Sequence, residues 1–404
     1  MRIAHLTQSY PPMISGAALV VRDLARNQAN HGHDLLIITA SDRAEAYTVR
    51  DGRLQVERLT SRKNPARVGQ RYLLWPARAV ATALHAFAPD VVHLHEPLVL
   101  GWSGLHAGQR LGVPTIFTAH QLPWFAAVYA PRLPGLPRLV ELLLWRYARW
   151  FLRQCTAVVA ATTTIGQIVT NQTGIKVHII GLGIDLQRYC PQPDNAAENS
   201  QLRQKYHLHP TQPILLHVGR LDRDKSVEEV LQAATQVLTR ANAQLVIVGD
   251  GSQRSALMAL SHQLGIADRC HFTGYVAPDS DDLPGLYRLA AVFVTASTLE
   301  TFGLVVTEAM ACGCPVVAAA ATCMPEIITP YRNGLLAPPH DPAGLANQLS
   351  WLLDHPADAA AIATAGRLQA QKYGLQAMET HYYDLYWAVL PPVPAPLVAP
   401  EGLS

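Results

Sequence analysis

Short apolar runs alternate along this chain with longer segments that repeat apolar residues at the helical period of 3.6. The short runs predict buried strands, and the longer segments predict helices that cover them. In the first half the predicted strands and helices are, in order, Ile3–Leu6, Ala17–His31, Asp34–Thr39, Leu73–Phe87, Val91–Leu94, Trp102–Leu111 and Thr115–Thr118, with a long helical region from about Leu136. This alternation indicates an α/β fold with a parallel, doubly wound sheet.

A second alternation of the same kind begins at Ile214 and runs to about Ala370. The segment from Ile184 to Pro213 is polar and contains prolines, so it is interpreted as a linker between two domains. Residues 375–390 form an aromatic helical pattern. The tail, 391–404, is rich in proline without any period, and we expect it to be disordered.

Composition is consistent with two well-packed domains, because the chain has 404 residues and 49% of them are apolar. The six cysteines show no C-x2-C pairing, which favours reduced thiols in a cytoplasmic protein over a zinc site or disulfides. The start, Met1 to Thr7, is interpreted as a strand rather than a targeting segment. No apolar stretch approaches the roughly 18 residues that cross a membrane, so no transmembrane helix is expected.

Charge is distributed unequally between the two halves. Residues 1–183 contain 19 Lys and Arg against 9 Asp and Glu, a net charge of +10, whereas residues 184–404 contain 13 against 21, a net charge of −8. A basic half indicates an anionic partner, which is either a membrane surface or a nucleic acid.

Two carboxylates separated by seven residues, Glu300 and Glu308, flank the dipeptide Phe302-Gly303. A carboxylate accepts hydrogen bonds from two adjacent hydroxyl groups, as a sugar or a ribose offers. Glycine lets main-chain N–H groups approach a phosphate, and a helix that begins near Gly303 would direct its N-terminus at that phosphate. An exposed helix start with two solvated acids is the alternative for this motif alone.

Upstream, the apolar run Ile214 to Val218 predicts a buried strand that ends at Gly219-Arg220, with Lys225 shortly after. Ligands of open α/β sheets bind at the carboxyl ends of the strands. Two cations there suit a diphosphate whose charge grows as it leaves, although a structural ion pair is the alternative. A second apolar run ends at the turn Gly249-Asp250-Gly251, and a third leads into the Glu300 loop.

Together these motifs resemble the retaining glycosyltransferases of family 4. They are G-R-L-x3-K at Gly219 to Lys225, G-D-G at 249–251, E-x-F-G-x4-E at 300–308 and E-A-M-A-C-G-x-P-V-V at 308–317. The resemblance covers nearly the whole chain and implies the GT-B fold, in which two Rossmann-like domains, here 1–183 and 184–374, face each other across a cleft. It also implies that the helix 375–390 crosses back onto the first, acceptor-binding domain.

The resemblance further implies transfer of a hexose from a nucleotide sugar by front-face chemistry, in which the leaving diphosphate takes the acceptor's proton. No metal or other cofactor is expected. His120 matches the family's T-x-H histidine, for which a merely structural role is the alternative. The chemical step is assigned to His120, Arg220, Lys225 and Glu300, and donor binding to Gly16, Gly219, Gly249, Asp250, Gly251, Tyr275, Phe302, Gly303, Leu304 and Glu308.

A possible metal site at His93, His95 and Glu96 matches no trusted zinc spacing, and a structural or substrate-facing role is favoured. The chain also departs from the family pattern. The residue after the lysine is usually glycine and is Ser226 here, and the usual G-G-x-P-E segment is replaced by residues 322–326, T-C-M-P-E, which are expected near the sugar pocket.

Two basic and aromatic regions in the first half predict how the acceptor is reached. A basic amphipathic helix with aromatic residues is typical of a membrane interface, while a core helix with a solvated basic face is the alternative. Leu139, Leu142, Leu143 and Trp150 would form its apolar face. Residues predicted to face the membrane or the acceptor are Arg62, Lys63, Arg67, Arg71, Trp145, Arg146, Arg149, Trp150 and Arg153.

The sequence therefore predicts a peripheral enzyme of the cytosolic membrane face that transfers a hexose to a lipid, of diacylglycerol or related type. Its predicted partners are a nucleotide sugar, the lipid acceptor and an anionic membrane surface. A soluble polysaccharide or metabolite acceptor is the alternative within the class. A nucleic-acid-binding protein is the alternative outside it, disfavoured because the donor motifs are intact.

Overall fold

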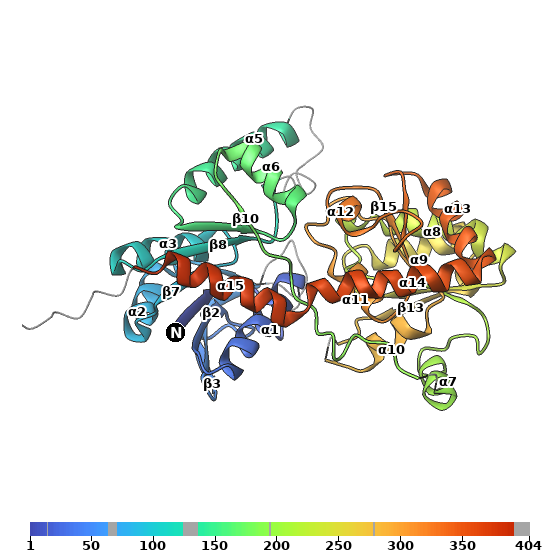
Figure 1. Cartoon of the computed structure of the whole chain (residues 1–404), viewed down its shortest axis with the longest axis horizontal. Helices are drawn as coiled ribbons and strands as arrows, with labels where there is room; N and C mark the ends of the chain where they lie inside the picture. The colour runs from blue at the N-terminus through green and yellow to red at the C-terminus, as the bar shows by residue number, and fades with distance from the viewer. Residues whose placement is uncertain (14, 64–70, 124–135, 194, 278, 392–404) are drawn as a thin grey trace, which may run out of the picture.

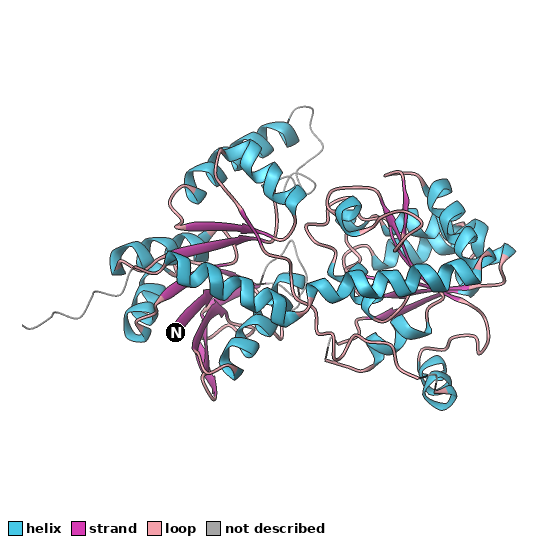
Figure 2. Ribbon diagram, viewed as in Figure 1, coloured by secondary structure: helices cyan, strands magenta, loops and turns pink. Residues whose placement is uncertain are grey.

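The computed structural model describes residues 1–13, 15–63, 71–123, 136–193, 195–277 and 279–391, which form two α/β domains side by side (Figure 1). Each domain has a central sheet with helices on both faces (Figure 2). The chain has the predicted α/β fold, with two parallel sheets.

Within the described residues, the first sheet has eight strands in the order β10-β9-β8-β7-β1-β2-β4-β3, parallel except for β3. Its strands are β1 (Arg2–Leu6), β2 (Asp34–Ala40), β3 (Tyr47–Asp51), β4 (Leu54–Leu59), β7 (Val91–Leu94), β8 (Thr115–Ala119), β9 (Ala157–Ala160) and β10 (His178–Ile179), with a separate hairpin of β5 (Ser61–Lys63) and β6 (Arg71–Leu73). The helices of this part are α1 (Gly16–Asn30), α2 (Ala77–Phe87), α3 (Val99–Leu111), α5 (Leu136–Leu152) and α6 (Thr163–Thr173).

The second sheet has six described strands, all parallel, in the order β13-β12-β11-β14-β15-β16. They are β11 (Ile214–Val218), β12 (Gln244–Val248), β13 (Cys270–Gly274), β14 (Val292–Thr295), β15 (Val316–Ala319) and β16 (Leu335–Ala337). The helices are α7 (Ala196–Lys205), α8 (Val227–Arg240), α9 (Arg254–Gln263), α10 (Asp282–Leu289), α11 (Leu304–Ala311), α12 (Met324–Ile327), α13 (Pro342–Asp354), α14 (Pro356–Ala370) and α15 (Leu375–Val389).

Two predicted elements differ from the structure. The helix predicted over Leu73–Phe87 begins only at Ala77, because Leu73 belongs to β6 and Trp75, which precedes Pro76, has φ +51°. A residue before proline is disfavoured in the α conformation. The predicted linker contains α7, which buries none of its residues and therefore lacks an apolar stripe that the pattern could reveal. Of the tail that we expect to be disordered, 392–404 lie outside the described residues.

The last helix leaves the second domain and packs on the first (Figure 1). Tyr382 and Tyr386 are buried in the core that also contains Ile3 and Ile37 of the first sheet. Glu379 accepts a hydrogen bond from His31, at the end of α1, at 2.8 Å. Burial of aromatic side chains of this size removes a large apolar area from water, so α15 ties the two domains together.

A second link between the domains is polar. Glu326 of α12 accepts hydrogen bonds from the main-chain N–H groups of Thr163 and Thr164, both at 2.9 Å, at the first turn of α6. These N–H groups have no partner within their own helix, and the helix dipole favours a negative charge there. A third link is an ion pair between Arg22 of α1 in the first domain and Asp279 of the second domain, at 2.7 Å.

The Glu326 contact is a weak latch, because a carboxylate at an exposed helix N-terminus contributes roughly 0.3–1 kcal/mol. Partial burial raises the pKa of Glu326, but the Thr164 and Thr163 N–H groups more than offset this and hold the pKa below its usual value. The carboxylate is thus retained at neutral pH and lost only in acid.

Glu326→Ala is expected to open the ligand-free protein, because the first turn of α6 loses its partner in the second domain. Small-angle X-ray scattering would detect a larger radius of gyration than in the parent. Glu228→Gln, a change on the exposed face of α8, is the control and should leave the radius unchanged. A Glu326→Ala protein as closed as the parent would contradict the role of the latch.

Candidate active site between the domains

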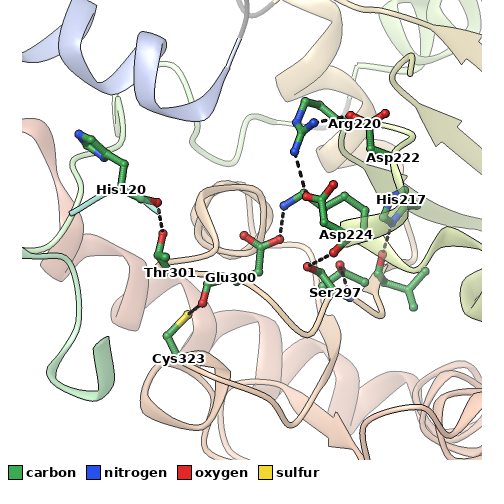
Figure 3. Close-up of polar contacts among 12 residues, drawn as sticks. His120, His217, Arg220, Asp222, Asp224, Ser297, Glu300, Thr301 and Cys323 are labelled. Carbon is green, nitrogen blue, oxygen red and sulfur yellow. Dashed lines mark hydrogen bonds and ion pairs between the residues drawn. The ribbon is translucent and has the colours of Figure 1, made fainter. Parts of the chain in front are cut away.

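Strand β11 delivers the first cation to the cleft. Arg220 follows Gly219 at the strand end, and its guanidinium donates to Asp222 and to Asp224, the latter at 2.9 Å (Figure 3). Asp224 is 3% exposed. Two carboxylates fix the guanidinium in one orientation before any ligand arrives, which matters because a preorganised donor costs little reorganisation.

The second cation is joined to the first predicted carboxylate. Lys225, in the short 3-10 helix Arg223–Lys225, lies 2.5 Å through its Nζ from Oε1 of Glu300. Burial raises the pKa of Glu300, but the charge and hydrogen bond of Lys225 more than compensate, so its pKa is lowered. Lys225, predicted to meet the diphosphate, and Glu300, predicted to hold the sugar hydroxyls, therefore form an ion pair with each other at the tips of β11 and β14.

Ser226 explains why this position usually carries glycine. It has φ +47° and begins α8, in the left-handed region that non-glycine residues adopt at a cost of about 1 kcal/mol or more. This turn directly follows Lys225, whose side chain reaches Glu300.

The glycines of the G-D-G turn serve close packing of two strand tips. A Cβ on Gly249 would lie 1.8 Å from the carbonyl oxygen of Gly219, and one on Gly251 would lie 2.5 Å from that of Leu221. Leu221 also donates its N–H to the carbonyl of Asp250 at 3.0 Å. These glycines hold the Arg220 turn in place, and their predicted contact with the donor stays a prediction.

Two helix N-termini meet at the cleft. Gly303 has φ +82° and caps α11, so the predicted helix start is present. A Cβ on Gly16, the first residue of α1, would lie 3.6 Å from Cδ1 of Leu304, the first residue of α11. The Leu304 side chain thus brings the start of α11 against the start of α1, and a helix start is a position that suits an anion such as a diphosphate.

Glu308 lies on α11 and lines a cavity of about 320 Å³ between the domains, together with Leu304 and Arg22. Its Oε2 accepts a hydrogen bond from the hydroxyl of buried Tyr287 at 2.9 Å. Burial raises the pKa of Glu308 to about 7. The carboxyl is half-ionised near neutral pH when no ligand is bound, and hydroxyl donors would favour its ionised form.

Two predicted donor contacts fall in different surroundings. Phe302 is 1% exposed and packs edge-on against Tyr373 at 5.0 Å, so its side chain belongs to the core and only its main chain remains for a donor. Tyr275 follows β13 and is 45% exposed. The motif that contains Phe302 and Gly303 could not show that the Phe302 side chain is buried, because a phenylalanine in a core and one that stacks on a ligand look alike in sequence.

His120 stands at the end of β8 in the first domain. Its carbonyl accepts a hydrogen bond from the hydroxyl of Thr301 at 3.0 Å, next to Glu300. The imidazole points away from Glu300 into the first domain (Figure 3), where its Nε2 lies 3.0 Å from Nδ1 of His95. The structure thus brings the main chain of His120 to the second domain's loop, and the predicted role of its side chain stays a prediction.

His93 and His95 have partners other than Glu96. Glu96 accepts N–H groups of Leu98 and Gly101 at 3.2 Å, at the start of α3. Among the described residues, ring nitrogens of His5, His93 and His95 lie within 4.8 Å of one another, the one such cluster with metal-ligand geometry. His95 bonds to His5 and His120 through its two nitrogens, as a packed hydrogen-bonded network does.

Thr301 and His217 lie near the site and carried no usable sequence signal, whereas Cys323 belongs to the T-C-M-P-E segment expected near the sugar pocket. Thr301 is a variable position of the motif, between Glu300 and Phe302. The thiol of Cys323 donates a hydrogen bond to the carbonyl of Glu300 at 3.2 Å. This places the T-C-M-P-E segment next to Glu300, while Glu326 of the same segment reaches α6. His217 is buried on β11, where it bonds to the carbonyl of Val294 at 3.0 Å.

The predicted membrane-facing residues divide into several groups. Trp145 is 6% exposed and packs in the first-domain core, so it is not available to a membrane. Arg71 bonds to the hydroxyl of Ser61 at 2.7 Å and serves the β5–β6 hairpin. Arg149 donates to the carbonyl of Gln172 at 2.6 Å, though it is exposed. Arg67 lies outside the described residues, while Arg62, Lys63, Arg146, Trp150 and Arg153 are exposed.

The apolar face of α5 is turned to solvent. Leu139, Leu142, Leu143 and Trp150 are between 46% and 65% exposed, while Phe151 and Leu152 near the helix end are buried. The alternative in which these leucines form a core face is therefore wrong for this helix. No helix among the described residues is long and apolar enough to cross a membrane.

Two facing α/β domains with cations, carboxylates and helix N-termini at their cleft define a GT-B glycosyltransferase. Residues 14–188 match the family described as Glycosyltransferase Family 4, and residues 198–369 match Glycosyl transferases group 1. A GDP-mannose-dependent alpha-mannosyltransferase of Mycobacterium tuberculosis is 34% identical over 84% of this chain and 84% of its own length. The chain belongs to glycosyltransferase family 4 and is a hexosyltransferase.

Another relative is the alpha-monoglucosyldiacylglycerol synthase of Streptococcus pneumoniae, 28% identical over 83% of this chain and 73% of its own. Among solved structures, the sucrose-phosphate synthase of Thermosynechococcus elongatus has a TM-score of 0.80 at 23% identity, covering 96% of this chain and 98% of that one. Anabaena HepE in complex with UDP-glucose has a TM-score of 0.77 at 22% identity, covering 96% and 100%. The GT-B fold is thus shared across different sugar transferases.

Lys225→Ala and Arg220→Ala are each expected to lower kcat far more than they weaken donor binding, because the charge of a leaving diphosphate is greatest in the transition state. Each lost contact should cost roughly 2–4 kcal/mol of transition-state stabilisation. Steady-state kinetics with saturating nucleotide sugar measure this. Arg223→Ala, an exposed neighbour on the same turn, is the matched control. Parental turnover in either variant would refute its assigned role.

The affinity for the nucleotide sugar is expected to rise with pH through about 7, because Glu308 then loses the proton that blocks hydroxyl donors. Glu308→Gln should remove this dependence and raise the donor KM about tenfold or more, since hydrogen bonds to a charged group contribute ~1.5–3 kcal/mol. The kcat should change little, because ribose contacts are similar in ground and transition states. Donor KM from pH 6 to 8 tests both, with exposed Asp268→Asn as the control.

Proposed function

We propose that this enzyme transfers a hexose, with retention of anomeric configuration, from a nucleoside diphosphate sugar to a lipid acceptor at the surface of a membrane. The donor side rests on the cations Arg220 and Lys225 and on the two helix N-termini at Gly16 and Leu304. No protein nucleophile is needed if the leaving diphosphate accepts the proton of the attacking hydroxyl. The chain's residues then only stabilise charge and fix geometry.

The exposed apolar face of α5 is the observation that carries the lipid acceptor. Large apolar side chains grouped on one helix face are costly in water and favourable in a bilayer interface. Arg146 and Arg153 are exposed on the same helix or directly after it, where they would meet anionic headgroups. Each such cation contributes about 1 kcal/mol near an anionic surface and is screened by salt.

An apolar groove of about 350 Å³ lies beside α5 in the same domain. Its walls come from the start of α2, the start of α3 and Tyr147 of α5, and Trp75 at its edge is 92% exposed. The groove supports the proposal because its apolar walls suit the acyl chains of a lipid. The printed names of the relatives point the same way, because one acts to make a glucosyldiacylglycerol and others are mannosyltransferases for phosphatidylinositol dimannoside.

Nucleotide release tests the proposal directly. The purified protein is incubated with GDP-mannose or UDP-glucose, with and without liposomes that contain diacylglycerol or phosphatidylinositol, and the release of nucleoside diphosphate is measured. We expect release that depends on liposomes and persists in excess chelator. Release that requires a soluble acceptor instead, or a strict need for a divalent ion, would refute the lipid acceptor or the metal-free mechanism respectively.

Leu142→Ser with Leu143→Ser is expected to reduce sedimentation with liposomes about tenfold or more, because each buried leucine side chain contributes about 1.5–3 kcal/mol. Arg146→Gln with Arg153→Gln should weaken binding to anionic liposomes only, and high salt should have the same effect on the parent. Leu368→Ser, which changes a leucine 61% exposed on α14 of the second domain, is the control. Equal binding by all variants would contradict the α5 interface.

A further inference from the structure

A continuous chain of hydrogen bonds joins α1 to the cleft through the interior of the first domain. Oε1 of Gln28 lies 2.8 Å from Nε2 of His5, and Nδ1 of His5 lies 3.0 Å from Nε2 of His95. Nδ1 of His95 in turn lies 3.0 Å from Nε2 of His120. In both imidazole–imidazole contacts, the Nδ1 of one ring thus faces the Nε2 of the next ring toward the cleft.

The sheet topology creates this chain. His5 is on β1, His95 follows β7 and His120 follows β8, and these three strands are neighbours in the first sheet. Gln28 and His5 are fully buried and His95 is 4% exposed, while His120 is partly exposed. The chain therefore runs from a buried amide to His120, a partly exposed residue beside the cleft.

All three imidazoles are neutral near pH 7. Burial lowers the pKa of His5 and of His120 to about 4, and it lowers the pKa of His95 well below the usual value. A neutral imidazole has one N–H donor and one acceptor nitrogen. The donor and the acceptor of every hydrogen bond in such a chain are consequently fixed by the end group that can only accept or only donate.

That end is Gln28, whose carbonyl oxygen only accepts. His5 must then carry its proton on Nε2 and accept on Nδ1 from His95, which must accept in turn from His120. We propose that Gln28, acting through His5 and His95, holds the proton of His120 on Nε2 and leaves Nδ1 of His120 as a hydrogen-bond acceptor for a hydroxyl group of a bound substrate. Gln28 is thus a positioning residue that never touches the substrate.

The proposal rests on the proposed function, because only a hexosyl transfer gives His120 a hydroxyl to meet. The chain of imidazoles itself can be tested without any activity. The histidine chain and the proposed function can therefore be refuted independently. If the protein transfers no sugar, the proton positions can still be measured, and protons found on the other nitrogens would refute the histidine chain without refuting the transferase activity.

A neighbouring branch of the network supplies a matched control. His93 lies against His95 at 4.1 Å between ring centroids, but it bonds to the Tyr386 hydroxyl at 2.8 Å and the Thr118 hydroxyl at 2.7 Å. Thr118 is also bonded to the Tyr382 hydroxyl at 2.9 Å. Tyr382→Phe removes one buried hydroxyl from this branch and changes no atom of Gln28, His5, His95 or His120.

The first experiment is nuclear magnetic resonance of the whole protein with nitrogen-15-labelled histidine. Couplings across the N–H···N hydrogen bonds identify donor and acceptor nitrogens, and we expect protons on Nε2 of His120 and His95 with Nδ1 of His95 and His5 accepting. Protons on Nδ1 of His5 and His95, or exchange between both arrangements, would overturn the proposal. Loss of these protons on addition of one equivalent of zinc would also overturn the proposal, because the histidines would then form a metal site.

The second experiment compares Gln28→Met with Tyr382→Phe. Gln28→Met should shift the nitrogen-15 resonances of His120, three hydrogen bonds away. It should lower kcat about tenfold with little change in donor KM, the lower end of the loss seen when a metal-bound imidazole loses its orienting partner. Tyr382→Phe should change neither. Resonances of His120 that are unaffected by Gln28→Met would show that the chain does not transmit the constraint.

Discussion

The parallel arrangement of the strands is the constraint on which the site depends. Because all parallel strands of one sheet end at the same edge, the loops after β11 and β14 lie together and bring Lys225 to Glu300. The loop after β8 belongs to the first sheet, and the packing of the two domains places His120 against Thr301. The glycines at 249 and 251 sharpen this arrangement, since side chains there would collide with the turn that carries Arg220.

Charge neutralisation explains the state of the ligand-free site. A buried charge without a partner is expensive, and each cation that is predicted to bind the diphosphate is paired with a carboxylate, Arg220 with Asp224 and Lys225 with Glu300. A diphosphate would compete with these carboxylates for the same cations and would release Glu300 to accept sugar hydroxyls. Binding of the diphosphate part of the donor would thereby prepare the contact for the sugar.

The sequence predicted the features that depend on local chemistry and missed those that depend on tertiary packing. The helix start at Gly303 and the strand tip at Arg220 follow from glycine and from short apolar runs, and both are present. Phe302 is predicted to contact the donor and Trp145 to face the membrane or the acceptor, but aromatic residues suit both cores and binding surfaces, and only the fold reveals that both side chains are buried. The histidine chain could not be found either, because it requires the order of three strands.

Helix α5 shows most clearly why a periodic pattern alone is insufficient. The same apolar stripe fits a core helix and a membrane-lying helix, because both remove one face from water. In this domain the core is already filled by Phe151 and Leu152 at the helix end and by Trp145, so Leu142 and Leu143 remain exposed. An exposed stripe of this kind is favourable only if something apolar covers it. For an enzyme with glycolipid-forming relatives, the interface that presents its acceptor would satisfy that requirement at the same time as it delivers the substrate.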